Sequence, residues 1–144
     1  MNDNRASRES PSPRLRIESI PGLNLDDALD RVMGNRALYE SLLLIYRDQY
    51  RSAPDRIEEW IGRGEWQTVE DLVHSIKGTS GMIGAVAVYQ AAEPLDQHLK
   101  ETIQTGIPPP GTLSLLDRFL AELRTLLMHL DRAAAEGSDS RGNP

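Results

Sequence analysis

The stretch EWQTVEDLVHSIKGTSGMI, from Glu65 to Ile83, decides the fold class because its apolar residues recur at helical spacing. Alternating steps of three and four positions place one stripe of side chains on a single face of a helix. The stripe consists of Trp66, Val69, Val73, Ile76, Ser80 and Ile83. The sequence therefore predicts an amphipathic helix whose stripe forms the seam of a helix bundle.

The segments on both sides of this stretch are also predicted to be helical, and none shows the alternation typical of a strand. The predicted ranges are 25–33, 36–51, 54–62, 86–105 and 112–135. Asn24 is expected to cap the first helix, and Pro54 suits the first turn of the third. Short connections favour antiparallel neighbours. We expect an all-α, up-down antiparallel four-helix bundle with an additional short N-terminal helix.

Three of these helices carry specific expectations. In the helix over 112–135, the predicted stripe consists of Leu116, Phe119, Leu123, Leu126, Leu130 and Ala133. In the helix over 36–51, the inward face is predicted to consist of Leu38, Leu42 and Ile45. In the helix over 86–105, Pro94 removes a backbone hydrogen bond and clashes with the preceding turn, at a cost of roughly 3 kcal/mol. We interpret Pro94 as a kink, with a break of the helix as the alternative.

Composition shifts at both ends of the chain. Residues 1–16 are rich in Ser, Arg and Pro, and residues 136–144 have a similar character. Both ends are therefore predicted to be disordered tails or linkers. The remaining range, 17–135, shows no internal repeat and is expected to form one domain.

Composition and charge exclude several classes of function. The chain has 144 residues, no cysteine and a net charge of -6. Thiolate metal sites and cysteine nucleophiles are thereby excluded, and phosphate backbones or anionic lipids would repel the chain. The sequence contains no apolar run long enough for a membrane span and no signal-peptide pattern at the N-terminus. We expect a cytoplasmic protein with no nucleic-acid and no membrane partner.

His74 is the most informative candidate for chemistry. It lies one position off the apolar seam, and the residues that share its helix face are Lys77, Gly78 and Gly81. A neutral imidazole is a competent nucleophile near neutral pH, and a nearby lysine can stabilise a phosphoryl group on it. The glycines remove steric cover, so that a partner protein can approach the ring.

Simpler interpretations stay open at this point. Spacing alone fits an ordinary solvated histidine and lysine pair, and the glycines fit close helix packing. His98 and His129 have no such neighbours and are expected to be ordinary surface or boundary residues. No two histidines have the spacing of a helical metal site, so no metal site is predicted.

The run His74-Ser75-Ile76-Lys77-Gly78-Thr79-Ser80-Gly81, followed by Ile83-Gly84-Ala85, resembles the signature of histidine-containing phosphotransfer (HPt) domains. The segments IPGLNLDDALDRVMGNRALYESLLLIYRDQY, RGEWQTVEDLVH and YQAAEPLDQHLKE also resemble this family, so the resemblance covers the whole range 17–135. It implies a four-helix bundle that carries phosphate on one histidine between the receiver domains of a two-component phosphorelay.

The resemblance also implies a role for individual residues. His74 would be the phosphoacceptor, reacting through Nε2, and Lys77 the cation near the phosphoryl group. Gly78 would keep the site open, and Asp96 would approach the imidazole from the adjacent helix and orient it. The chain itself would need no cofactor, because Mg²⁺ would belong to the partner receiver. It would act as a phosphocarrier without autonomous kinase activity.

A receiver would have to cover His74, so docking is expected to use exposed residues one or two turns away. The predicted docking or orienting residues are Glu70, Gly81, Asp96 and Gln97, with Lys77 beside them. The expected partners are response-regulator receiver domains and a hybrid sensor histidine kinase, and the expected state is a monomer. Whether the domain is freestanding or a part of such a kinase stays open. The alternative function is a helical adaptor or dimerisation module that never carries phosphate.

Overall fold

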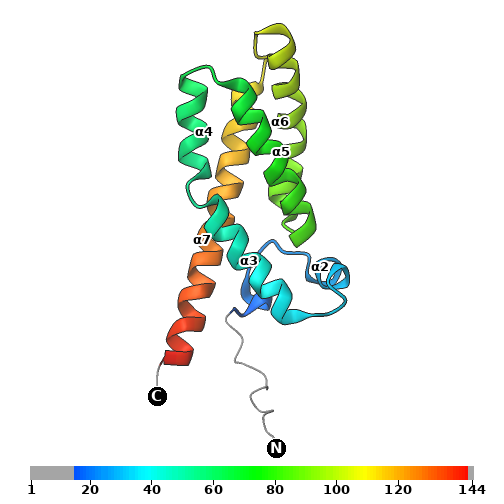
Figure 1. Ribbon diagram of the computed structural model, residues 1–144, viewed down its shortest axis with the longest axis vertical. Coiled ribbons are helices and arrows are strands. Elements are labelled where there is room, and N and C mark those ends of the chain that lie inside the picture. Colours follow the sequence, from blue (N-terminus) through cyan, green and yellow to red (C-terminus); the bar gives the residue numbers. More distant parts are fainter. Residues whose placement is uncertain (1–14, 143–144) are drawn as a thin grey trace, which may run out of the picture.

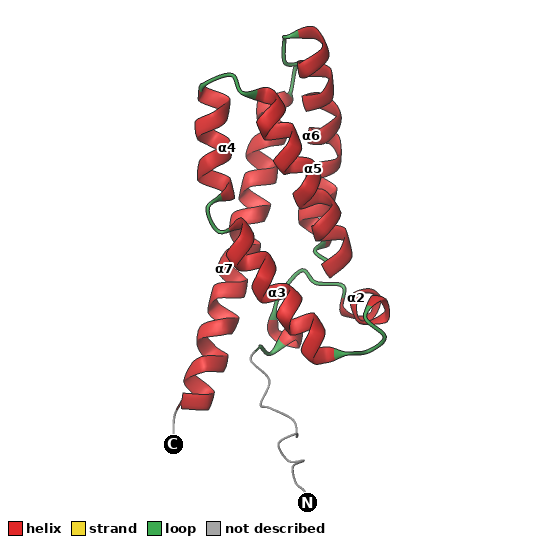
Figure 2. Ribbon diagram, viewed as in Figure 1, coloured by secondary structure: helices red, strands yellow, loops and turns green. Residues whose placement is uncertain are grey.

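The computed structural model describes residues 15–142, and these are helical with short connections and no strand (Figure 2). The elements are η1 (Ile17–Ser19), α2 (Leu25–Arg31), α3 (Arg36–Tyr50), α4 (Ala53–Gly62), α5 (Trp66–Ile83), α6 (Val86–Thr105) and α7 (Thr112–Gly142). No helix in this described part combines the length and apolar character needed to cross a bilayer.

Four arms build the bundle (Figure 1). Helices α3 and α4 follow each other in one direction and form the first arm, which is divided at Arg51 and Ser52. Helices α5, α6 and α7 are the other three arms, and each runs antiparallel to the one before. Helix α5 packs against α3, α4 and α6, while α7 closes the other side. The predicted up-down antiparallel bundle with a short N-terminal helix is confirmed.

The turn between α5 and α6 is tied to the segment before α2. Gly84 ends α5 in a left-handed conformation at φ 79°, and a Cβ there would lie 2.7 Å from the backbone oxygen of Asn24. The Asn24 N–H donates to the Gly84 carbonyl at 2.8 Å. The Asn24 side chain caps α2 as predicted, by accepting from the Asp27 N–H at 3.2 Å. Only glycine fits this close approach with a positive φ.

The core follows the stripes that the sequence predicts for α5 and α7. Val69, Val73, Ile76, Ser80 and Ile83 are buried on α5, and Trp66 is half-buried. The predicted α7 stripe is buried throughout, from Leu116 to Ala133. Burying each large aliphatic side chain contributes about 1.5–3 kcal/mol, so these two faces hold the bundle together.

The prediction for α3 is wrong by one position. Leu38 and Ile45, expected to face inward, are 44% and 56% exposed, and Leu42 is only partly buried. The residues buried on α3 are instead Tyr39, Glu40, Leu43, Tyr46 and Tyr50. A tyrosine buries a large ring when its hydroxyl finds a partner, and this outweighs the aliphatic residues beside it.

Each buried tyrosine of α3 does find a partner on α5. The Tyr39 hydroxyl donates to the Ile83 carbonyl at 2.6 Å, and the Tyr46 hydroxyl lies 2.8 Å from Ser80 Oγ. The Tyr50 hydroxyl lies 3.2 Å from Ser75 Oγ and 3.3 Å from the Thr79 hydroxyl. Helix α3 therefore fixes α5 along its length, while α6 packs against another side of α5.

The predicted ends of the domain need correction. Of the predicted N-terminal tail, Leu15 is fully buried in the core and Arg16 is exposed, whereas residues 1–14 lie outside the described residues. Helix α7 continues from Ala135 to Gly142, because no proline lies between these two residues to end it earlier. Only residues 143–144 of the predicted C-terminal tail lie outside the described part. Helix α6 runs through Pro94, so the alternative of a break is wrong.

Candidate functional site

His74 projects from the middle of α5 into solvent. Its side chain is 60% exposed, whereas the preceding residue, Val73, is fully buried in the core. This difference follows from the helical period, which turns His74 about 100° away from Val73. A protein partner can therefore reach the imidazole without any rearrangement of the bundle.

Asp96 holds one nitrogen of this imidazole. Its Oδ2 atom lies 3.2 Å from His74 Nδ1 and comes from α6, the helix packed beside α5. An ionised carboxylate only accepts hydrogen bonds, so Nδ1 must carry the proton that is donated. In this tautomer Nε2 keeps its lone pair. The nitrogen that Asp96 does not contact is thus the one with a lone pair.

Two lysines keep Asp96 ionised. Lys77 Nζ and Lys100 Nζ lie 3.1 Å and 2.7 Å from Asp96 Oδ2, and the Asp96 side chain is 1% exposed. Burial alone would raise the pKa of this carboxyl, but hydrogen bonds outweigh burial and hold the pKa well below its usual range. The neighbours that lower the pKa are the Glu70 carboxyl group and the hydrogen-bond donors Lys100, Lys77 and His74.

Lys100 was not predicted from the sequence as a site residue. It also contacts a second carboxyl group, since its Nζ lies 3.5 Å from Glu70 Oε2. The hydrogen bond to Asp96 raises the pKa of Lys100. One sequence signal could have identified it, because Asp96 and Lys100 are four positions apart on one helix and so share a face.

Glu70 is not the exposed docking residue that we expected. It is 7% exposed, and its Oε2 has no hydrogen-bond partner within the described residues. Burial raises the pKa of the Glu70 carboxyl, and the neighbouring Asp96 carboxyl raises it further. The prediction placed Glu70 correctly one turn before His74, but its side chain points between α5 and α6, where it meets Asp96 and Lys100.

The two predicted glycines differ in what surrounds them. A Cβ at Gly81 would lie 3.2 Å from the Tyr89 ring, so close packing between α5 and α6 explains this glycine. A Cβ at Gly78 would meet nothing within 4 Å, so packing inside the described protein does not explain that glycine. Glycine within a helix costs about 1 kcal/mol relative to alanine. The surface at Gly78 is therefore open beside His74.

The remaining predicted residues lie as follows. Gln97 is exposed on α6, directly after the buried Asp96. His98 contacts the start of α7, with its Nδ1 3.1 Å from the Thr112 hydroxyl. His129 lines a small cavity of about 210 Å³ on α7. Neither histidine takes part in the contacts between His74 and Asp96.

Three side chains at the site carry atoms that metals bind. One ligand atom each from Glu70, His74 and Asp96 lies within 4.8 Å of the others. Two ammonium groups, however, already contact Asp96 at hydrogen-bond distance. These positive charges oppose a divalent cation at the same carboxylate. The expectation that the chain needs no metal of its own stays a prediction.

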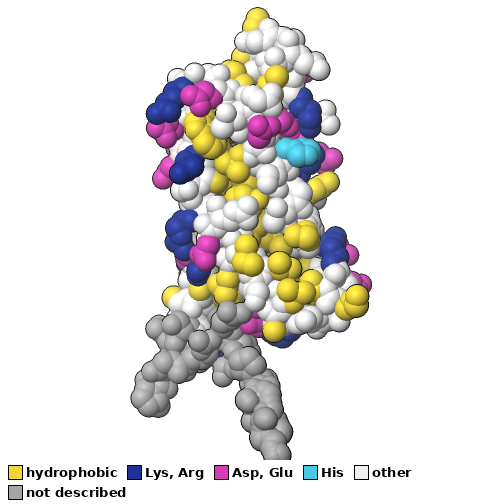
Figure 3. Space-filling view, viewed as in Figure 1, with side chains coloured by type: hydrophobic (Ala, Val, Ile, Leu, Met, Phe, Trp, Pro, Cys, Tyr) yellow, Lys and Arg dark blue, Asp and Glu magenta, His cyan; other side chains and the backbone are white. Residues whose placement is uncertain are grey.

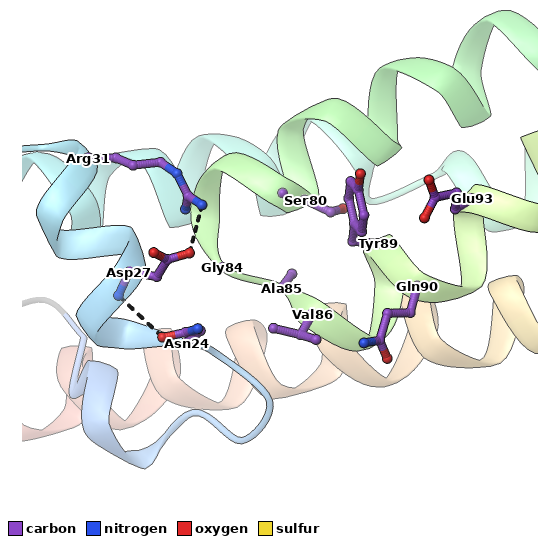
Figure 4. Close-up of a pocket in the computed structure, with 11 residues that line it drawn as sticks. Asn24, Asp27, Arg31, Ser80, Gly84, Ala85, Val86, Tyr89, Gln90 and Glu93 are labelled. Carbon is purple, nitrogen blue, oxygen red and sulfur yellow. Dashed lines mark hydrogen bonds and ion pairs between the residues drawn. The ribbon is translucent and has the colours of Figure 1, made fainter.

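A cavity of about 480 Å³ opens further along α5, between α2 and the turn from α5 to α6. Figure 4 shows Arg31 and Asp27 on α2 facing Ser80 and Tyr89 across it. Gly81 lines this cavity but His74 does not. The cavity thus lies about two helical turns from the histidine.

The same face of the molecule combines charge with apolar surface. Figure 3 shows an exposed histidine among basic and acidic side chains, with hydrophobic side chains gathered toward α2 and α3. Exposed large hydrophobic residues in and beside α2, α3 and the turn from α5 to α6 include Met33, Leu38, Ile45, Met82 and Val86. A surface that is partly apolar and partly charged is typical of transient protein partners.

Comparison with known protein families gives one match. The model of the Hpt domain matches residues 41–113, just over half of the chain. Comparisons with curated proteins and with solved structures found no match. The matched range begins within α3 and ends at the start of α7, so it includes both His74 and Asp96. The chain therefore belongs to the Hpt domain family and acts as a phosphocarrier in the phosphorelays of two-component signalling.

Proposed function

We propose that His74 accepts a phosphoryl group from the aspartyl phosphate of a receiver domain and passes it to the aspartate of another receiver. The lone pair of Nε2 forms a bond to phosphorus, and the bond from phosphorus to the aspartate oxygen breaks. The donor aspartate leaves as a carboxylate, and the Nδ1 proton stays in its hydrogen bond. The second transfer repeats these steps in reverse, with the acceptor aspartate as the nucleophile.

One observation carries this proposal. Asp96 engages Nδ1 at 3.2 Å, while the ring itself is more than half exposed. The protein thus fixes the ring through one nitrogen and offers the other to a partner. The buried carboxylate also stabilises the positive charge that develops on the imidazole as the new bond forms.

Lys77 and Gly78 have supporting roles in this proposal. The contact with Asp96 holds Lys77 Nζ beside the imidazole, so its positive charge can interact with the phosphoryl oxygens. Gly78 lies one turn after His74 and leaves that side of the ring uncovered. A receiver can then bring its aspartyl phosphate into line with Nε2.

The partners in this proposal are receiver domains and a hybrid sensor kinase that contains one. A receiver would cover His74 and Gly78 and extend toward Gly81 and Gln97, which flank the site on α5 and α6. Mg²⁺ would be bound by the receiver, and the chain would act as a cytoplasmic monomer. The alternative of an adaptor that never carries phosphate offers no reason for the uncovered glycine at position 78.

The test is transfer from a panel of phosphorylated receiver domains to the purified chain. We expect acid-labile, base-stable phosphate on the wild type and none on His74→Gln. His98→Gln is the matched control, because it removes a histidine from α6 without touching the site. Equal labelling of His74→Gln, or no labelling by any receiver, would overturn the proposal. Incubation with ATP alone should give no label, because transfer requires a phosphorylated receiver.

A further inference from the structure

Glu70 and Asp96 are buried so close together that ionising both carboxyl groups would be strongly unfavourable. Both residues are less than 10% exposed, and their carboxyl oxygens lie within 4.8 Å of each other. Two negative charges at that distance in a buried site repel each other strongly. Carboxyl pairs in such positions hold one proton between them.

The hydrogen bonds around the two carboxyl groups leave one oxygen of each group without a donor, and one added proton would supply it. Asp96 Oδ2 receives contacts from His74, Lys77 and Lys100. Its other oxygen, Oδ1, is buried and accepts no hydrogen bond from the described residues. Glu70 Oε2 also lacks a hydrogen bond there, although Lys100 Nζ lies 3.5 Å from it. Both are acceptors when ionised. A proton on Glu70 would turn one of them into a donor for the other.

We propose that Glu70 is a neutral carboxylic acid whose O–H donates to Asp96 Oδ1, and that this bond positions Asp96 to hold the His74 ring. The inference rests on the proposed function, because it explains how the phosphoacceptor is oriented. Glu70 is a positioning residue and does not touch the phosphoryl group.

The charge of the site changes with this proton. With Glu70 neutral, the ammonium groups of Lys77 and Lys100 face a single carboxylate, which leaves one net positive charge beside His74. With Glu70 ionised, this net charge vanishes, and a second carboxylate lies one turn from the incoming phosphoryl group. The neutral form therefore favours the dianionic phosphoryl group on His74.

The groups that face Glu70 come from two helices. His74 follows it by one turn on α5, and Asp96 and Lys100 approach it from α6. Within the described residues, no charged side chain of α3, α4 or α7 contacts it. The protonated form of Glu70 is therefore favoured by burial and by Asp96 and opposed by Lys100.

The first experiment looks for the proton directly on the unphosphorylated chain. Difference infrared spectra of wild type and Glu70→Gln at pH 7 should show the carbonyl band of one protonated carboxyl group, shifted in D₂O. The control is Glu101→Gln, which replaces an exposed glutamate on α6 and should show no such band. If the wild type lacks a protonated carboxyl group, the proposal is wrong, whatever its transfer activity.

The second experiment asks whether the bond positions the ring. Glutamine at position 70 can donate its amide N–H to Asp96 Oδ1, whereas alanine cannot. We expect Glu70→Gln to accept phosphate about tenfold faster than Glu70→Ala. The nitrogen-15 spectrum of His74 should show one tautomer in wild type and in Glu70→Gln, and a mixture in Glu70→Ala. Equal rates and equal tautomers in the two variants would overturn the positioning role.

The two proposals fail in different ways. If no receiver labels the wild type, the transfer function fails, but the infrared band and the His74 tautomer still test Glu70. If the wild type is labelled, the pH dependence of its acceptance rate is compared with that of Glu70→Gln. Equal declines with rising pH would show that the charge effect assigned to Glu70 is wrong. We expect the decline to be steeper in the wild type, because only the wild type gains a negative charge.

Discussion

Asp96 Oδ2 lies 3.2 Å from His74 Nδ1, although the two residues are 22 positions apart and lie on different helices. The contact exists because α5 and α6 pack tightly along their length and both residues face the same side of that hairpin. A short carboxylate suffices here because the helices are close, and the two lysines keep it charged. This pair determines which nitrogen of the ring is free to react.

Replacing Asp96 by asparagine should slow acceptance of phosphate by about tenfold or more, because the neutral amide stabilises a positively charged ring less well. It also removes the charge that holds Lys77 and Lys100. The measurement is a single-turnover transfer from a labelled receiver. The control is Asp117→Asn, an exposed aspartate on α7. A rate for Asp96→Asn equal to that of the control would show that the carboxylate is dispensable.

Replacing Gly78 by alanine should have opposite effects on stability and on transfer. The position is exposed within a helix and a Cβ meets nothing, so the free energy of unfolding should rise by about 0.5–1 kcal/mol. Transfer should fall, because the methyl group lies where the receiver must approach His74. Urea unfolding and single-turnover transfer give the two values.

The control for this substitution is Gly62→Ala, since a Cβ at Gly62 also meets nothing and the residue lies on α4. Its transfer rate should match the wild type. If Gly78→Ala transfers as fast as Gly62→Ala, the open surface at Gly78 serves no partner, and the adaptor interpretation regains weight.

The sequence predicted the fold well where aliphatic side chains carry the pattern. The stripes on α5 and α7 consist mainly of such residues, and their period alone identifies the buried face. On α3 the pattern was misleading, because Tyr39, Tyr46 and Tyr50 are buried in place of Leu38 and Ile45. Whether a tyrosine is buried depends on a partner for its hydroxyl, and these partners lie on another helix.

The candidate site shows the same division between local and distant information. His74, Lys77 and Gly78 share one helix face, so their proximity follows from spacing. The burial of Glu70 and the contact between Lys100 and Asp96 depend on how α5 and α6 are packed together. A charged residue near the seam can be predicted to lie near the site, but its protonation depends on neighbours that only the fold brings together.

Leu15 and Leu38 offer a matched test of the fold. Leu15 is fully buried although the composition of its segment predicts a tail, and Leu38 is 44% exposed although its spacing predicts the core. Leu15→Ala should lower the free energy of unfolding by about 2–5 kcal/mol, and Leu38→Ala by less than about 1 kcal/mol. Urea unfolding of both variants measures the difference. Equal losses would contradict the packing of Leu15 in the core.

High pH should weaken the fold through the tyrosines of α3. Burial raises the pKa of Tyr39 from 10.0 to about 12, and burial raises the pKa of Tyr46 as well. A raised pKa means that the folded state keeps a proton that the unfolded chain loses. The stability contributed by Tyr39 is therefore complete below about pH 10 and is lost as the pH rises toward about 12.

Tyr39→Phe separates this titration from packing. At pH 8 the variant should be less stable by about 1–3 kcal/mol, because the buried Ile83 carbonyl loses its donor. Between about pH 10 and 12 its free energy of unfolding should fall less steeply than that of the wild type, since one titrating group is gone. Tyr89→Phe is the control, because Tyr89 is only half-buried, and it should follow the wild type. Parallel curves for Tyr39→Phe and wild type would show that the Tyr39 hydroxyl is not held in the core as the fold requires.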